Sequence, residues 1–417
     1  MNNLNPFNPN SVVGSNLFAG RTKLINEICK KMEQIKHSMP SSFFIYGERG
    51  IGKTALAKLI RYIAIVNDPT FHHLNFITSY YSVESGQELN SVLQESLNKL
   101  TDEMDVNLLN KIGAKLGKVF QNGKFQIGAF GATVGLEVAQ NDKTKQITIK
   151  DQTVSILSNT IKSLNEEGVK DGILIIIDEL HNLKHLETAA SIFRNIITTL
   201  DVEGLGKISF LLIGYEEDVT KFFLQDTSAR RTFDMYPLDV MPDNEAEEVL
   251  TKGFTTAGVK WDSLSLARNI SIAGGYPHSI QIIGHNLINK DQDKFVDQSD
   301  WASAIVDSAF DLQSKSFSSM YSFGKTITTE KDKILIALAN QNKTLSRKEI
   351  AQITGNKNVY QYIPLLKESG AIKENDKKGI FLQSQLLRTS ILIDQRIRKL
   401  LQENQALKQR MKEELGS

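Results

Sequence analysis

Short apolar runs alternate with longer amphipathic stretches over the first 240 residues of the chain. Several of these runs are apolar at every position, which is typical of strands that are buried on both faces of a parallel sheet. Five strands are predicted, at residues 43–46, 73–83, 172–177, 207–213 and 235–238. The intervening stretches predict helices near residues 24–32, 53–66, 86–100, 151–166 and 189–200. This strand–helix order predicts an α/β core, a parallel sheet with helices on both faces.

The pattern becomes purely helical beyond Met241, where Pro242, Asp243 and Asn244 supply residues that start a helix. Further helices are predicted near residues 262–273, 277–289 and 299–316. Helices at 330–340, 346–355 and 359–369 then precede a hairpin at 371–382, an order typical of a winged helix-turn-helix. The predicted parts are a lead-in (1–17), the core (18–240), an all-α domain (241–318), the winged helix-turn-helix (325–390) and a C-terminal helix (391–417).

Residues 101–147 interrupt the α/β rhythm of the core. A basic helical piece is followed by residues 125–138, where glycines break a strand-like alternation. We predict a helix and a curled hairpin inserted into the core, which serve either as a packing ornament or as an interaction surface.

The C-terminal helix has apolar residues at heptad spacing. These are Ile393, Ile397, Leu400, Leu407 and Met411, with Asn404 at an a position. The spacing predicts either a short coiled coil with a second chain or packing of the helix on its own domain.

Composition and charge limit the class of protein. With 41% hydrophobic residues, 23% charged residues and a net charge of +1, the chain is typical of soluble globular proteins and has no global field directing it to nucleic acid or membrane. The longest aliphatic run, residues 173–177, is too short to span a bilayer, and the polar start lacks the apolar core of a signal peptide. The single cysteine, Cys29, is expected in the core. We therefore expect a cytoplasmic protein with no membrane partner.

The stretch after the first predicted strand carries the strongest chemical signal. It matches G-x-x-x-x-G-K-[ST] between a strand and a helix, which is the context of a phosphate-binding loop. Glycines let successive backbone N–H groups point at phosphate oxygens, and the following helix adds the positive end of its dipole. Lys53 is expected on the β- and γ-phosphates of ATP, and the Thr54 hydroxyl on Mg²⁺. The predicted ATP-binding residues here are Gly47, Glu48, Arg49, Gly50, Ile51, Gly52, Lys53, Thr54 and Ala55.

Two carboxylates, Asp178 and Glu179, end the most apolar strand. In a doubly wound sheet they lie beside the phosphate loop. Asp178 is expected to hold Mg²⁺ with Thr54, and Glu179 to orient and deprotonate the attacking water.

Arg230 and Arg231 precede the last predicted strand. We expect them at the carboxyl-end edge of the sheet, facing outward. One of them is a candidate arginine finger for a neighbouring subunit's nucleotide, and the alternative is an ion pair with a carboxylate of their own chain.

The segments GERGIGKT, ILIIIDE and SARRTF, followed by a helical region and a winged helix, resemble the AAA+ ATPases. From residue 14 to about residue 390 the chain is similar to their origin-recognition initiator branch and to the related archaeal-type and STAND ATPases. The resemblance implies a P-loop NTPase core with a helical lid, hydrolysis of ATP with Mg²⁺, and nucleotide-dependent self-assembly. It also implies that Phe18 to Arg21, and so Gly20 and Arg21, lie near the adenine.

Two departures from the initiator pattern imply slow, switch-like hydrolysis. Initiators usually carry a polar residue where this chain ends a strand with LLIGY. They also carry a lid arginine, whereas this lid helix opens with Gly274-Gly275-Tyr276-Pro277-His278. The Gly-Tyr-Pro run resembles the G-x-P motif of STAND switches, which implies that Pro277 and His278 lie at the nucleotide.

The winged helix supports two functions. If it binds DNA, the predicted contacts on the recognition helix and the wing are Lys357, Asn358, Gln361, Lys367, Lys377 and Lys378. The alternative is a signalling or defence-type ATPase subunit in which the winged helix and the insertion bind a protein partner. A salt-dependent DNA titration separates the two.

Overall fold

A computed structural model describes most of the chain and divides it into two compact units. The described residues are 5–9, 20–66, 73–125, 148–168, 170–312, 321–322, 329–341 and 343–414. One unit, called here the sheet unit, comprises Arg21–Glu48 and Lys53–Asp239. The other, called the helical unit, comprises Met1–Gly20, Arg49–Gly52 and Val240–Ser417.

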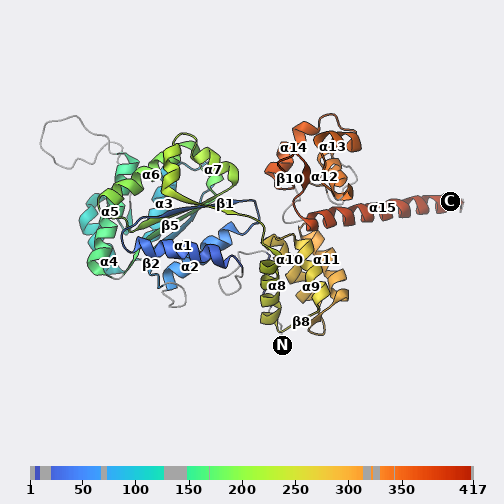
Figure 1. Cartoon of the computed structure of the whole chain (residues 1–417), viewed down its shortest axis with the longest axis horizontal. Coiled ribbons are helices and arrows are strands. Elements are labelled where there is room, and N and C mark those ends of the chain that lie inside the picture. The colour runs from blue at the N-terminus through green and yellow to red at the C-terminus, as the bar shows by residue number, and fades with distance from the viewer. Residues whose placement is uncertain are drawn as a thin grey trace. The chain divides into compact units, whose positions relative to one another are not determined.

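Five parallel strands form the main sheet of the described chain, in the order β2-β5-β6-β1-β7 (Figure 1). They correspond to the five strands predicted from the apolar runs. Their bounds are β1 Ser42–Gly47, β2 Phe76–Ser82, β5 Gly172–Asp178, β6 Ile208–Gly214 and β7 Phe233–Leu238. Strands β5 and β6 are buried at every residue, as unbroken apolar runs require. The prediction of a parallel α/β core is confirmed.

Helices of the sheet unit pack on this sheet and on one another through apolar faces (Figure 1). Their bounds are α1 Thr22–Ile35, α2 Lys53–Val66, α3 Leu89–Thr101, α4 Val106–Leu116, α5 Ile149–Glu167, α6 Leu186–Val202 and α7 Glu216–Phe222. The 3-10 turns in the described part of this unit are η2 Gly117–Val119, η3 Leu180–Asn182 and η4 Thr227–Thr232. Cys29 of α1 is fully buried, as expected, and burial raises the pKa of its thiol to about 12. The short α7 was not predicted.

The insertion is described in part. Helix α4 is followed by a small hairpin of β3 Phe120–Gln121 and β4 Lys124–Phe125. On α4, Lys115 pairs with Glu166 of α5 at 2.8 Å, and Lys111 pairs with Glu167 of the same helix. These contacts give α4 a packing role. Residues 126–147, with most of the predicted curled hairpin, lie outside the described residues.

The helical unit begins with a bundle and continues into the winged helix-turn-helix (Figure 1). The bundle contains α8 Asp243–Ala257, α9 Ser263–Ala273, α10 Pro277–Lys290 and α11 Gln298–Leu312, with short strands β8 Lys260–Trp261 and β9 Phe295–Val296. The second part contains α12 Glu330–Gln341, α13 Arg347–Thr354, α14 Val359–Glu368, β10 Ile372–Glu374 and β11 Ile380–Leu382. Helix α15, Gln385–Glu414, ends the described chain. The predicted order of lid, winged helix-turn-helix and C-terminal helix is confirmed.

The start of α15 packs differently from the predicted heptad seam. Leu387 and Ile391 are fully buried, whereas Ile393 and Ile397 of the predicted seam are only half-buried. This end of α15 packs against α11 and α12, which agrees with packing on its own unit. The side chains of Leu400, Leu407 and Met411 lie outside the description, so the coiled coil stays a prediction.

A short segment near the N-terminus is anchored in the helical unit. Phe7 is 3% exposed and inserts between α8 and α10. An added Cβ would lie 2.0 Å from its ring at Gly253 and 2.6 Å at Gly284, so the socket requires both glycines. The Asn5 Nδ2 group also donates a hydrogen bond to the His285 carbonyl oxygen at 2.9 Å. Residues 5–9 are therefore an integral part of the packing of this unit.

Within the described ranges, none of the helices combines the length and the hydropathy needed to cross a bilayer.

Candidate active site

The predicted phosphate loop joins the carboxyl end of β1 to the first turn of α2. Gly47 lies so close to β7 that an added Cβ would be 2.5 Å from the Leu238 carbonyl oxygen. Gly50 and Gly52 have φ values of 78° and 92°, a backbone conformation that glycine adopts readily. Close approach and positive φ therefore explain the glycine spacing of the motif.

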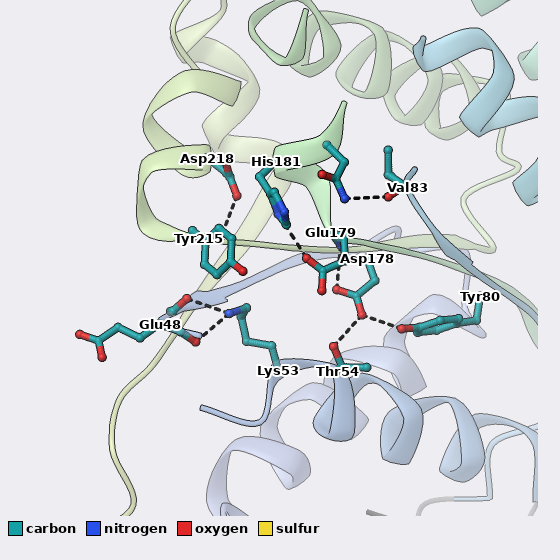
Figure 2. A network of polar contacts seen from close by, with 12 residues as sticks. Glu48, Lys53, Thr54, Tyr80, Val83, Asp178, Glu179, His181, Tyr215 and Asp218 are labelled. Carbon is teal, nitrogen blue, oxygen red and sulfur yellow. Dashed lines mark hydrogen bonds and ion pairs between the residues drawn. The ribbon is translucent and has the colours of Figure 1, made fainter. Parts of the chain in front are cut away.

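Lys53 is the half-buried cation of this loop. Its Nζ donates hydrogen bonds to the carbonyl oxygens of Gly47 and Glu48, each at 2.8 Å (Figure 2). The same ammonium lies 4.5 Å from the centre of the Tyr215 ring. Burial lowers the pKa of Lys53 to about 8, although carboxylates, led by that of Glu179, oppose the shift. A desolvated ammonium held by carbonyl oxygens and a ring gains strongly from an anion, which a phosphate provides.

Asp178, the last residue of β5, is joined to the loop by Thr54. The Thr54 hydroxyl donates to Asp178 Oδ2 at 2.7 Å, and the Tyr80 hydroxyl on β2 donates to the same oxygen at 2.6 Å (Figure 2). Asp178 is 2% exposed. Burial and the Asp178 carboxylate raise the pKa of Tyr80 far above its usual range, so the phenol remains a donor. The carboxylate is thus fixed by two hydroxyl groups from α2 and β2.

These residues fit a magnesium ion. Mg²⁺ takes oxygen ligands and usually combines one or two protein groups with water and substrate phosphates. The Thr54 hydroxyl and the Asp178 carboxylate offer two oxygens 2.7 Å apart at the end of the loop. In the described part of the chain, no group of three or more His, Cys, Asp or Glu side chains could hold a metal by itself. Nucleotide and water would therefore complete the coordination.

Glu179 follows Asp178 in a left-handed conformation, with φ of 60° and ψ of 45°. Its backbone N–H donates to Asp178 Oδ1 at 2.8 Å. Its carboxylate points into the same space as Lys53, and His181 Nδ1 lies 3.2 Å from its Oε2 (Figure 2). Non-glycine residues in this conformation concentrate at functional sites. The turn after β5 therefore presents one carboxylate to the metal position and a second, partly exposed carboxylate beside it.

The chain resembles known proteins in sequence and in fold. Residues 18–281 match a family of ATPase domains that come predominantly from Archaea. The chain belongs to this family. Its fold is similar to that of a Walker-type ATPase of Pyrococcus abyssi, with a TM-score of 0.52 and 12% identity over 90% of this chain and 96% of that one. It is also similar to the ORC2 protein of Aeropyrum pernix in ADPNP–ADP complexes, with a TM-score of 0.50 and 12% identity over 93% and 96%. No curated protein matches the chain.

The resemblance to the archaeal-type ATPases is therefore confirmed, and the chain carries an ATPase domain of that family. The remaining motif residues of the loop differ in solvent exposure. Ile51 is fully buried, Arg49 is exposed and Ala55 is half-buried. Their roles in nucleotide binding remain predictions.

The ATPase has a tyrosine where the initiator pattern has a polar residue. Tyr215 follows β6, and its N–H donates to Asp218 Oδ2 at 2.6 Å. An added Cβ on Gly214 would lie 2.8 Å from that oxygen, so the glycine leaves room for the buried carboxylate. The ring of Tyr215 lies 4.8 Å from that of His181, between centroids (Figure 2). The strand end is thus occupied by a ring with defined neighbours.

The residues expected at the adenine and in the lid are placed as follows. Gly20 has a φ of 77°, and Arg21 has a φ of 58° and donates from its guanidinium to the Asp239 carbonyl oxygen at 2.8 Å. Pro277 and His278 form the first turn of α10.

Two loop glycines lie against that first turn within the helical unit. An added Cβ on Gly52 would be 3.5 Å from Pro277 Cγ, and one on Gly50 would be 3.7 Å from His278 Cβ. The proximity of this turn to the loop agrees with the role implied for Pro277 and His278, which stays a prediction.

The two candidate finger residues lie at the opposite edge of the sheet from the one expected. The turn η4, which contains Arg230 and Arg231, directly precedes β7, and Phe233 of β7 pairs in parallel with Ser42, the first residue of β1. Both arginines therefore lie at the amino-end edge, and the carboxyl-end prediction is wrong. The chain returns through α7 from the end of β6 to the start of β7, and the sequence does not show where along this return an arginine falls.

Both arginines are exposed. The Arg230 guanidinium lies 5.9 Å from the centre of the Phe223 ring. Neither arginine forms an ion pair within the described part of the chain. The own-chain pairing is thus not observed there, and the finger role stays a prediction.

The predicted DNA contacts are exposed. These include Lys357, Asn358, Gln361, Lys377 and Lys378. Lys367 is exposed as well but is paired, because its Nζ lies 2.9 Å from Glu374 Oε2 on the wing. Arg347 contacts the other oxygen of Glu374 at 3.0 Å, so this carboxylate joins α13, α14 and the wing. A structural role competes with a DNA contact at Lys367.

Sequence reasoning missed three side chains around the motif residues: Tyr80, His181 and Tyr215. The first lies inside a predicted strand without a motif. His181 follows Glu179 by two residues, and Tyr215 ends a predicted strand. These two positions are the signals in the sequence that point to the site. Only the strand order, with β2 and β6 on either side of β5, brings them together.

Proposed function

We propose that the protein is a Mg²⁺-dependent ATPase with slow turnover whose nucleotide state controls its self-assembly and its binding to DNA. The observation that supports this most is the joined arrangement of Lys53, Thr54, Asp178 and Glu179 at one edge of the sheet. Lys53 binds phosphate oxygens, Asp178 and Thr54 hold the metal, and Glu179 takes a proton from water. The metal, when bound, neutralises charge on the phosphates.

Slow turnover is supported by what surrounds Glu179. Its carboxylate contacts His181, and a tyrosine ring occupies the end of β6. Turnover below about 1 s⁻¹, the low end of common enzyme rates, is expected.

Calorimetry and phosphate release test the ATPase site. Lys53→Ala should lose binding of ATP with Mg²⁺, because it removes the cation that the loop surrounds, whereas Lys30→Ala on the exposed side of α1 serves as the matched control. Glu179→Gln should bind ATP and lose turnover, since it removes the base and keeps Asp178. Unchanged affinity in Lys53→Ala, or wild-type turnover in Glu179→Gln, contradicts the assignment.

DNA binding is supported by the exposed lysines of α14 and the wing. A titration with duplex DNA at several salt concentrations should show affinity that falls with salt. Replacing Lys357, Lys377 and Lys378 by alanine should weaken binding and reduce the slope of log affinity against log salt by roughly 3, at about 0.9 per lost phosphate contact. Lys331→Ala on α12 is the control.

A protein partner is the second candidate for this surface. Tyr360 and Leu365 on α14 are 59% and 47% exposed, and exposed aromatic and aliphatic side chains on one helix favour protein contacts. Absence of DNA binding at low salt, with or without ATP, would favour this candidate over DNA.

A further inference from the structure

His181 lies between the candidate base and the ring at the end of β6. Its Nδ1 is 3.2 Å from Glu179 Oε2, and its ring centroid is 4.8 Å from that of Tyr215, with 41° between the ring planes (Figure 2). The Tyr215 ring in turn lies 4.5 Å from Lys53 Nζ. A continuous row of side chains thus runs from the phosphate loop to the carboxylate of Glu179.

The carboxylate of Glu179 needs a partner to hold one orientation. Its side chain is 41% exposed, and its backbone occupies a left-handed conformation that directs it away from β5. Within the described chain, His181 is its one ion-pair or hydrogen-bond partner. Without this contact, free rotation about the side-chain bonds would spread the carboxylate over several rotamers.

His181 is itself held on both sides. It belongs to η3, where the neighbouring Leu180 is buried and Asn182 Nδ2 donates to the Val83 carbonyl oxygen at 2.9 Å. On its other side the backbone of Tyr215 is held by the hydrogen bond from its N–H to Asp218 Oδ2, and its ring contacts Lys53 Nζ. An imidazole supported in this way can set the position of a carboxylate that has little other support.

We propose that His181 is a positioning residue that holds Glu179 in the orientation needed to accept the proton of the attacking water. The inference rests on the proposed role of Glu179 as the base. The water oxygen forms the new bond to phosphorus as the bond to ADP breaks, and the water proton passes to Glu179. Throughout, His181 Nδ1 stays beside the other carboxylate oxygen and does not exchange protons with the substrate.

Two substitutions separate the polar contact with Glu179 from the packing against Tyr215. His181→Asn keeps an N–H donor near the Nδ1 position, whereas His181→Phe keeps a ring against Tyr215 and lacks the donor. In His181→Phe, kcat should fall about 10- to 100-fold, the scale of loss from misplacing a reacting group. KM for ATP and the affinity for ADP should stay within about twofold, and His181→Asn should recover most of kcat.

A double-mutant comparison shows whether His181 acts through Glu179. In the Glu179→Gln background, His181→Phe should cause no further loss of kcat, because the group it positions is already inactive. An independent loss in that background overturns the inference.

The remaining outcomes separate this inference from the proposed function. Glu179→Gln with wild-type turnover overturns the assignment of the base. An inactive Glu179→Gln with wild-type kcat in His181→Phe overturns only the positioning role. Equal losses in His181→Phe and His181→Asn also overturn it, since they indicate a need for the imidazole beyond its donor. ADP affinity serves as the check that each variant is folded.

Discussion

At the scale of single residues, the site depends on Lys53, whose charged form is destabilised by burial in the free protein. Burial lowers the pKa of Lys53 to about 8, and Gly47 and Glu48 offer it only carbonyl oxygens. Phosphate oxygens next to Nζ favour the charged form and so raise this pKa. Nucleotide binding and proton uptake are therefore linked at this residue.

The expected consequence is an affinity for ATP that weakens as pH rises through about 8. The charged form binds phosphate, the free protein holds its proton only below a pKa of about 8, and the bound protein holds it to higher pH. The linked affinity is thus fully present below pH 8 and falls by up to about tenfold per pH unit above it. Calorimetry at pH 8 in two buffers of different ionisation enthalpy measures the proton uptake.

Lys53→Arg is the matched control for this linkage, because a guanidinium stays charged throughout the range. Provided that it still binds nucleotide, its proton uptake at pH 8 should be smaller than that of the wild type. Equal heats in the two buffers for the wild type would exclude the linkage.

The residues of the two motifs could be predicted, and those around them could not. Gly47, Lys53, Thr54, Asp178 and Glu179 are recognisable because their chemistry fixes a spacing along the chain. The partners of these residues come from neighbouring strands. Which strands are neighbours is decided by the packing of the whole sheet, and local sequence does not encode it.

At the scale of elements, the anchored segment at residues 5–9 gives the helical unit a side chain from a distant part of the sequence. Phe7 fills the socket between α8 and α10 and meets Phe254 edge-on, with ring centroids 5.8 Å apart. The sequence predicts only a polar lead-in here, since a single phenylalanine among asparagines and prolines gives no periodic signal. Burial of an aromatic side chain outweighs that local polarity.

Phe7→Ala should therefore destabilise the helical unit. Loss of a buried phenylalanine costs about 3–5 kcal/mol, because apolar contacts disappear and a cavity remains. Denaturant unfolding of the full chain, followed by a probe in the helical unit, measures the shift. Phe310→Ala, at a position 42% exposed on α11, should have little effect. Equal midpoints for the wild type and Phe7→Ala would show that the socket contributes nothing to stability.

At the scale of the whole molecule, exposed arginines are the candidates for contact between copies. Arg230 and Arg231 lie at the amino-end edge of the sheet, away from the loop that follows the carboxyl end of β1. Their planar guanidinium groups suit a phosphate. A surface that meets a different surface of the next copy builds a ring or a filament.

Replacing both arginines by alanine should weaken assembly in ATP and lower hydrolysis together, while ATP binding is retained. Sedimentation of the wild type and the double variant with a non-hydrolysable ATP analogue provides the measurement. Arg268→Ala on α9 is a control, because this arginine stacks near Trp301 in the helical unit. A wild type that stays monomeric with every nucleotide, with or without DNA, would rule out the finger.

The buried thiol of Cys29 simplifies fluorescent labelling of the protein for such experiments. Thiol reagents attack the thiolate, and a fully buried group with a pKa near 12 offers almost none at neutral pH. A cysteine introduced at Val202, which is 88% exposed at the end of α6, would then be the one reactive sulfur on each copy. A fluorophore attached there would report association between copies with one dye per chain, and the native cysteine could stay in place.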